Sequence, residues 1–193
     1  MTTEEIITAF HQGSTGNCVS VAIIKAGIEV FGLGHVFDAE PQNDGSQQIT
    51  LRDGTQLLLT VAELDYARQH SLFVPGNSPE VFDYANFCYA VIAKRVQQDE
   101  QGGGQTYAEA IDDLNGGAYY LEAPRWLGLQ HYVRALGLRF VQQYAGVIGA
   151  SPHHCFFASH KLADDHGDVD PIRWFDLKYK FYHYLRLDTQ PVY

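Results

Sequence analysis

The chain contains few cysteines and few basic residues, and each shortage excludes a class of protein. Its 193 residues include three cysteines, which form an odd set without a C-x-x-C pair: Cys18, Cys88 and Cys155. This set indicates neither a disulfide-bonded scaffold nor a zinc site. The 13 Lys and Arg stand against 23 Asp and Glu, which gives a formal charge of -10. We therefore expect no nucleic acid and no anionic membrane as partner, because both bind clustered cations.

Signals for export, membrane insertion and cofactor binding are also lacking. The segment after Met1 has no basic stretch followed by an apolar one, and no apolar run reaches about 18 residues. We expect a cytoplasmic protein, or one exported without a cleavable signal peptide. The Gly-rich stretch 99–105 follows no strand and precedes no Lys-Ser or Lys-Thr pair, so it is interpreted as a linker rather than a phosphate loop. No cofactor is expected.

One short motif does indicate chemistry. Gln12 stands six residues before Cys18, and an apolar helix with almost no polar face is predicted directly behind the cysteine, over 19–31. A thiol at the first turn of a helix is near unpaired amides and the positive end of the helix dipole, so we expect the pKa of Cys18 to be lowered. The Gln12 amide and the Cys18 backbone N–H would form an oxyanion hole.

The order Gln-Gly-Ser-x-Gly-x-Cys resembles the segment around the nucleophile of papain-like cysteine peptidases, including their calpain-like branch. The resemblance implies an α+β fold in which an N-terminal helical lobe carrying the nucleophile helix packs on a C-terminal antiparallel β-sheet. It also implies that Cys18 is the nucleophile and that Gln12 lines the oxyanion hole. Val19 departs from the family, which has tryptophan there. The alternative is a glycine-rich turn before a buried helix, with Cys18 packed as a small apolar residue.

The far end of the chain supplies the other groups that this family needs. His154 lies 136 residues after Cys18, a separation typical of papain and cathepsins. In the family the base opens a strand, which favours His154 over His153, since neighbouring strand residues point to opposite faces. Asp176 stands where the family places asparagine or aspartate and would orient the imidazole. The alternative for the His pair is a loop feature or an accidental metal-binding pair.

The remaining pattern predicts one domain over 1–193, helix-rich to about 136 and strand-rich from about 137. A hairpin is predicted over 48–60, around Asp53-Gly54. The predicted helices are 60–70, 78–98, 106–115 and 124–136, and the predicted strands are 138–144, 154–159, 172–177 and 180–187. The acidic segment 164–170 is interpreted as a solvated loop between strands, because its spacing does not match a helix-loop-helix calcium site.

Three functions are compatible with these residues. The first is a papain-like thiol hydrolase that cleaves a peptide, isopeptide or side-chain amide through a Cys-His-Asp triad and a thioester. The second is an effector or toxin that acts as a glutamine deamidase, transglutaminase or acyltransferase on a protein partner. The third is a catalytically inactive binding module. The expected partner is a protein or peptide substrate, and the oligomeric state is left open.

Overall fold

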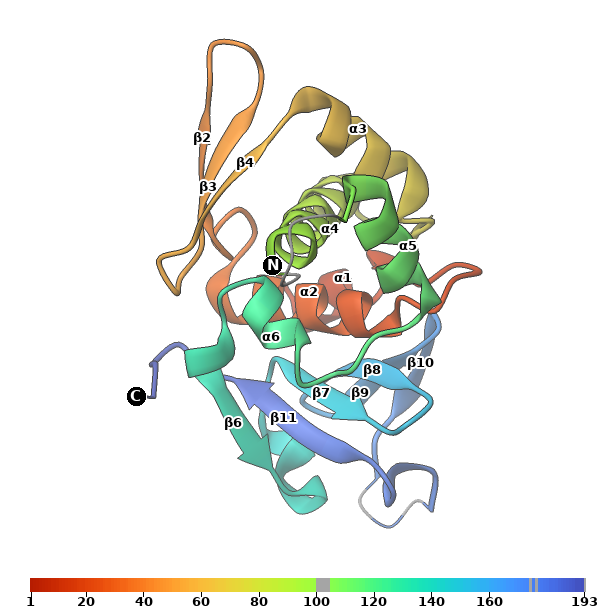
Figure 1. Ribbon diagram of the computed structural model, residues 1–193. Coiled ribbons are helices and arrows are strands. Elements are labelled where there is room, and N and C mark those ends of the chain that lie inside the picture. Colours follow the sequence, from red (N-terminus) through yellow and green to blue (C-terminus); the bar gives the residue numbers. More distant parts are fainter. Residues whose placement is uncertain (100–104, 174, 176, 193) are drawn as a thin grey trace.

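The computed structural model describes residues 1–99, 105–173, 175 and 177–192, and it has an α+β fold in which helices lie over an antiparallel sheet (Figure 1). The α-helices are α1 (Thr3–Ile7), α2 (Cys18–Phe31), α3 (Val61–His70), α4 (Pro79–Asp99), α5 (Tyr107–Gly116) and α6 (Ala123–Trp126). Short 3-10 segments are η1 (Gln130–Tyr132), η2 (Leu138–Gln143) and η3 (Leu177–Tyr179).

The strands form three sheets, and every pair within them is antiparallel. The largest sheet has the order β10-β9-β8-β7-β11-β6. Its strands are β6 (Val133–Leu136), β7 (Val147–Ala150), β8 (Cys155–Ser159), β9 (Leu162–Asp165), β10 (Asp168–Pro171) and β11 (His183–Leu187). The two smaller sheets contain β2 (Asp38–Pro41), β3 (Gln47–Thr50) and β4 (Gln56–Leu59), and β1 (Phe10–His11) with β5 (Val74–Pro75).

Helix α2 lies at the centre of the molecule, between the other helices and the large sheet (Figure 1). Every residue from Val19 to Ile28 is buried. One side of α2 packs on β8 and another on α4, and the three elements share one hydrophobic core. This central position confirms the prediction of a buried helix behind Cys18.

Two charged side chains of α2 attach the helix to the sheet. Lys25 is fully buried, forms an ion pair with Asp164 of β9 and donates to the Ile7 carbonyl at 2.6 Å. Burial lowers the pKa of Lys25, and the charge of Asp164 partly offsets this effect. One turn later, Glu29 accepts hydrogen bonds from the Gly146 backbone N–H and the Ser159 hydroxyl. Lys25 and Glu29 therefore hold α2 on the sheet through polar contacts, although the sequence of the helix is otherwise almost entirely apolar.

The opposite face of the sheet carries a second, smaller core. Phe156 of β8 packs there against the rings of Tyr179, Tyr182 and Tyr184. The buried members of this core are Val141, Val147, Phe156, Ala158, Ala163, Ile172, Tyr179 and Tyr184. Alternate residues of β8 thus face two different cores, as the two-residue period of a strand requires.

Several local predictions are confirmed. The predicted hairpin corresponds to β3 and β4, joined through Gly54 with φ of 84°. Thr60 and Thr106 each form a capping box, with Glu63 and Glu109 respectively. Helices α3, α4 and α5 therefore begin within one residue of the predicted positions.

The predicted helix over 124–136 and strand over 138–144 are wrong. The helix ends at Trp126, because Gly128 turns the chain with φ of 69° and its backbone lies against Leu51 and Arg52. Residues 133–136 instead form β6, which pairs with β11. Residues 138–143 form the 3-10 segment η2, which buries Val141 in the second core.

Predictions near the C-terminus are also corrected. The acidic segment 164–170 is the end of β9, a tight turn and most of β10, rather than a loop. Ile172 and Arg173 lie outside any strand, and positions 174 and 176 of the predicted strand 172–177 lie outside the described residues, as do positions 100–104 of the predicted linker. The last strand begins at His183 instead of Lys180.

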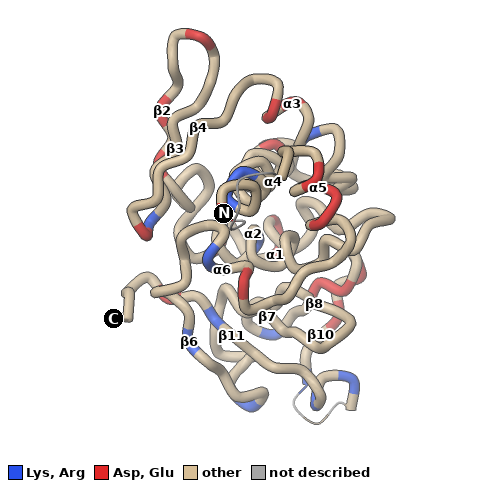
Figure 2. The backbone as a smooth tube through the Cα atoms, in the orientation of Figure 1, with Lys and Arg blue, Asp and Glu red and all other residues tan. Residues whose placement is uncertain are grey.

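Charged side chains are unevenly distributed over the fold (Figure 2). Acidic residues gather on α5 and at the edge formed by β9 and β10, whereas basic residues lie on β6 and β11. Within the described part of the chain, no helix has the length and apolarity that crossing a bilayer requires.

Candidate functional site

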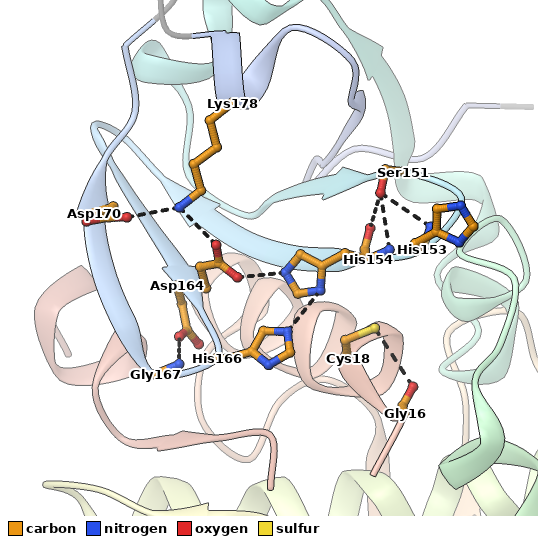
Figure 3. A network of polar contacts seen from close by, with 11 residues as sticks. Gly16, Cys18, Ser151, His153, His154, Asp164, His166, Gly167, Asp170 and Lys178 are labelled. Atoms are coloured by element: carbon orange, nitrogen blue, oxygen red, sulfur yellow. Dashed lines mark hydrogen bonds and ion pairs between the residues drawn. The ribbon is translucent and has the colours of Figure 1, made fainter. Parts of the chain in front are cut away.

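Three backbone segments meet at the N-terminal end of α2 (Figure 3). The first is the loop 12–17 before the helix, the second is the turn 151–154 before β8, and the third is the turn between β9 and β10. Each carries a side chain that lines the cavity beside Cys18: Gln12 in the first, His154 in the second and His166 in the third. The sheet and α2 hold all three segments, since α2 packs directly on β8.

The loop before Cys18 is held by the end of α5. Asn17 is buried, and its amide donates to the Ser71 carbonyl at 2.7 Å and to Asn115 Oδ1 at 3.0 Å. The Gly16 backbone N–H donates to the Asn115 carbonyl at 2.7 Å. A Cβ atom on Gly16 would stand 3.0 Å from that carbonyl oxygen, so the close approach favours glycine.

Cys18 is the first residue of α2, and its thiol points toward the Gly16 carbonyl at 3.8 Å (Figure 3). Burial raises the pKa of this thiol above its ordinary value, and the backbone N–H groups of Cys155 and Val19 only partly oppose the effect. The structure therefore differs from the expected lowered pKa, because desolvation outweighs the favourable helix terminus. The resting thiol is protonated, and a base must generate the thiolate.

Gln12 follows β1 and lines the same cavity as Cys18. Its side-chain amide donates to the Thr15 carbonyl within its own loop. The amide must therefore exchange this bond before it can donate to an oxyanion. The neighbouring His11 ring packs on Gly167, where a Cβ atom would lie 2.8 Å from His11 Cγ. The Gln12 loop thus lies directly against the turn between β9 and β10.

A compact turn fixes the position of His154. The Ser151 backbone N–H donates to the His154 carbonyl at 2.8 Å, and the Ser151 hydroxyl accepts from the His154 backbone N–H at 3.1 Å. The His154 ring is half-buried and lines a small cavity with Gln12 and Cys18, whereas His153 is exposed. The structure therefore brings three of the predicted residues together at one cavity.

The carboxylate beside His154 belongs to Asp165. Oδ1 of Asp165 lies 2.9 Å from His154 Nε2, although the ring N–H is not aligned with it as in a hydrogen bond. Oδ2 of Asp165 lies 2.9 Å from Lys178 Nζ. Burial would raise the pKa of Asp165, but Lys178 and His154 hold it below its usual range. Asp165 is thus an ionised partner for the imidazole, while Asp176 lies outside the described residues.

The environment of His154 also keeps its ring neutral. Burial lowers the pKa of His154, and the charge of Asp165 offsets only part of this effect. His154 Nδ1 lies 3.1 Å from Nε2 of His166, in the turn between β9 and β10. A neutral imidazole can accept a proton, so the ring is prepared to act as a base.

Asp165 and His166 were not identified from the sequence, yet the strand register explains the position of Asp165. Phe157 of β8 pairs with Asp164 of β9, so the next position along β9, Asp165, lies opposite Phe156. His154 is two residues from Phe156 and shares its face, which makes it a diagonal neighbour of Asp165. A predicted strand over 162–165 would have revealed this pair.

The cavity beside Cys18 has a volume of about 770 Å³. Its lining residues are Gln12, Gly16, Cys18, Val19, Gly116, Gly117, Ala118, Tyr119, Tyr120, Ser151, Pro152, His153, His154, Cys155, His166 and His183. Among these described lining residues there is no Lys, Arg, Asp or Glu. The rings of Tyr120 and His183 stack at 8° across one side. The cavity therefore offers aromatic surface, backbone and histidine, rather than fixed charge.

No family model, curated protein or solved structure matches the chain. The functional assignment therefore depends on the arrangement of Cys18, His154, Asp165 and Gln12.

Proposed function

We propose that the protein is a papain-like thiol hydrolase that cleaves a peptide, isopeptide or side-chain amide bond. The observation that carries the proposal is a thiol at the start of a buried helix that shares one cavity with a histidine, which in turn contacts a carboxylate. Cys18 is the nucleophile, His154 the base, and Asp165 the group that orients the imidazole. Gln12 lines the same cavity on the side of the helix terminus.

The arrangement of elements supports a papain-like fold. The nucleophile helix α2 packs on an antiparallel sheet, and the strand that it contacts, β8, begins directly after the base. Helical elements precede most of this sheet in the chain, as the family resemblance implies. The Gln-to-Cys spacing is the sequence feature that connects this arrangement to the family.

The proposed reaction begins when His154 Nδ1 takes the Cys18 proton and the sulfur forms a bond to the substrate carbonyl carbon. The oxyanion is stabilised by the Cys18 backbone N–H and by Gln12 after it leaves Thr15. The imidazolium then protonates the amine as the C–N bond breaks, which leaves a thioester. Water gives a proton to His154 and attacks the thioester, and the C–S bond breaks as the thiol recovers its proton.

Two contacts must change before this reaction starts. The Cys18 thiol must turn away from the Gly16 carbonyl, and His154 Nδ1 must exchange His166 for the thiol. Catalytic hydrogen bonds of free enzymes are often poorly aligned and form only with substrate. The resting structure is therefore an uncharged state of the thiol and imidazole that substrate binding activates.

The chemistry of the cavity indicates the class of substrate. A cavity without lysine or arginine among its described lining residues has no fixed cation for a phosphate or carboxylate group. Tyrosine rings and exposed glycine backbone fit an uncharged segment of polypeptide or a side-chain amide. Deamidation and acyl transfer use the same four residues, so an effector or toxin of that type is the nearest alternative. A cytoplasmic location, or export without a cleavable signal, remains our prediction.

A specific observation favours the inactive binding module as a second candidate. Burial raises the pKa of Cys18, and His154 Nδ1 is directed at His166. An unused thiol in an apolar environment has this property. The two candidates differ in whether His154 controls the reactivity of Cys18.

The first test is alkylation of the three cysteines, read by mass spectrometry from about pH 5 to about pH 9. A peptidyl acyloxymethyl ketone, which enters a substrate cleft, is compared with iodoacetamide, which does not need one. We expect the ketone to label Cys18 selectively near neutral pH and His154→Ala to abolish that labelling, because the base generates the thiolate. Iodoacetamide is expected to react with Cys18 mainly at alkaline pH. Equal ketone labelling in both proteins at every pH would contradict the catalytic proposal and support the binding module.

A second test identifies the orienting carboxylate. Asp165→Asn is expected to lower the rate of Cys18 labelling by the ketone about 10²- to 10⁴-fold, because a neutral amide no longer stabilises the imidazolium or fixes its tautomer. Asp176→Asn is the matched variant and should leave the rate within about threefold. If Asp176→Asn slows the reaction and Asp165→Asn does not, then Asp176 is the third member of the triad, as the family resemblance implies.

A further inference from the structure

We propose that His154, Asp165 and His166 form an inhibitory Zn²⁺ site at the edge of the cavity. One donor atom from each residue lies within 4.8 Å of the others. The proposal that zinc binds here follows from this geometry alone. The proposal that zinc inhibits depends also on the proposed function of His154 as the base. Figure 3 shows the two imidazole rings facing each other beside Cys18.

The distances within the cluster are close to those of a zinc site. Nε2 of His166 lies 3.1 Å from His154 Nδ1, and Oδ1 of Asp165 lies 2.9 Å from His154 Nε2. Tetrahedral zinc with bonds of about 2.0–2.1 Å separates its ligand atoms by about 3.3 Å. The two distances involve different nitrogens of His154, and one ion takes a single nitrogen, so side chains of the cluster must rotate before the three donors are directed at one point.

The backbone at His166 forms the tight turn that positions this ring. His166 has φ of 58° and is followed by Gly167 with φ of 93°. Two successive positive φ angles define a tight hairpin turn in which asparagine and glycine are the favoured residues. Histidine is among the non-glycine residues that accept a positive φ, and this turn places the His166 ring 4.5 Å from the ring of His154.

Asp165 is held as a ligand would be. Lys178 contacts Oδ2 and leaves Oδ1 directed at His154. Metal-bound carboxylates commonly have a second partner of this kind, which fixes their orientation. Acidic residues at the β9–β10 edge add an electrostatic attraction for cations (Figure 2).

The donor set indicates which metal is bound. Two imidazole nitrogens and one carboxylate suit zinc, whereas calcium takes oxygen ligands. Cys18 lines the same small cavity as His154 and His166, so water or the Cys18 sulfur would complete the set of four ligands. Sequence spacing indicates no zinc site, because His154 precedes β8 and His166 follows β9, and the two rings meet only through the pairing of these strands.

Metal at this site would stop the proposed reaction. A nitrogen of His154 that is bound to zinc cannot accept the Cys18 proton, and the cavity beside the thiol becomes occupied. Because zinc binds reversibly, its removal by a chelator restores the base. The cluster would thus hold the enzyme inactive wherever free zinc is available.

The experiment is a zinc titration of the full chain after chelator treatment, in competition with a chromophoric zinc chelator. We expect one zinc per chain, and an affinity at least about tenfold lower in His166→Asn, which keeps a residue suited to the turn. His153→Asn is the matched control, since that ring is nearby but outside the cluster, and its affinity should stay within about twofold. Cobalt in place of zinc should give the intense visible bands of four-coordinate geometry, with a near-ultraviolet thiolate band only if Cys18 is a ligand.

The outcomes separate the metal site from the thiol chemistry. Ketone labelling of Cys18 should slow with one equivalent of zinc in the native protein and be insensitive to it in His166→Asn. Equal zinc affinity in the native protein and His166→Asn, or an equal loss in His153→Asn, would overturn the site. A third outcome is that zinc binding depends on His166 but the ketone does not label Cys18 even without metal. That result would support the zinc site and contradict the proposed hydrolase.

Discussion

Cys18→Ala is expected to lower amide hydrolysis by about 10⁴-fold or more, the largest effect of any single change in this chain. The variant cannot form the thioester, and a water molecule alone must attack the substrate carbonyl. The remaining Gln12 and backbone N–H groups would give only residual catalysis. Hydrolysis is measured with fluorescently labelled unfolded casein and with a panel of peptide amides.

Cys88→Ala is the matched control for this loss. Cys88 is fully buried in α4, and burial raises its pKa well above the ordinary value. The variant should retain activity within a fewfold, because this thiol packs in the hydrophobic core and does not line the cavity beside Cys18. Native hydrolysis that survives in Cys18→Ala, or disappears in Cys88→Ala with the fold intact, would contradict the assignment of the nucleophile.

Lys25→Met is expected to lower the free energy of unfolding by about 3–5 kcal/mol. The substitution keeps the length of the side chain but leaves the Asp164 carboxylate buried without its cation. It also removes the donor to the Ile7 carbonyl. Urea unfolding followed by circular dichroism measures the change.

Two further variants show how much of the stability loss in Lys25→Met comes from the buried charge. Lys25→Met combined with Asp164→Asn should recover part of the loss, since the amide is uncharged and its oxygen can still accept from the Gly167 backbone N–H. Arg68→Met removes an exposed ion pair with Asp83 and should change stability by less than about 1 kcal/mol. A loss below about 1 kcal/mol in Lys25→Met would show that the buried pair does not stabilise the packing of α2 on the sheet.

The part of the fold that the sequence predicts correctly is the part that short-range signals determine. The capping boxes at Thr60 and Thr106 satisfy helix amides within three residues, and the Asp53-Gly54 turn brings its own two strands together. The apolar stretch after Cys18 has no favourable position except the core. Each of these signals acts within one element, so no distant partner is needed to interpret it.

The incorrect predictions lie where distant segments decide the structure. Residues 133–136 form a strand because β11, about fifty positions later, pairs with them. Half of the residues in β9 and β10 are aspartates, which have little strand propensity, and the hairpin forms by pairing with β8. Asp165 and His166 were missed for the same reason, because their positions beside His154 depend on that register. The single-domain prediction remains a prediction.

The anchoring of the loop before Cys18 by Asn115 has a mechanical consequence. The nucleophile is positioned by α5 and by the segment around Ser71, whereas the base and its carboxylate are positioned by the sheet. The reacting atoms are therefore supported from two sides, by α5 on one side and by the sheet on the other, and both sides contact α2. A displacement of α5 relative to the sheet by a fraction of an ångström would separate the Cys18 sulfur from the His154 imidazole. The hydrogen bonds within each side would be kept. The reactivity of Cys18 thus reports how well the sulfur and the imidazole are aligned. It is more sensitive to a small displacement than any measure of helix or strand content.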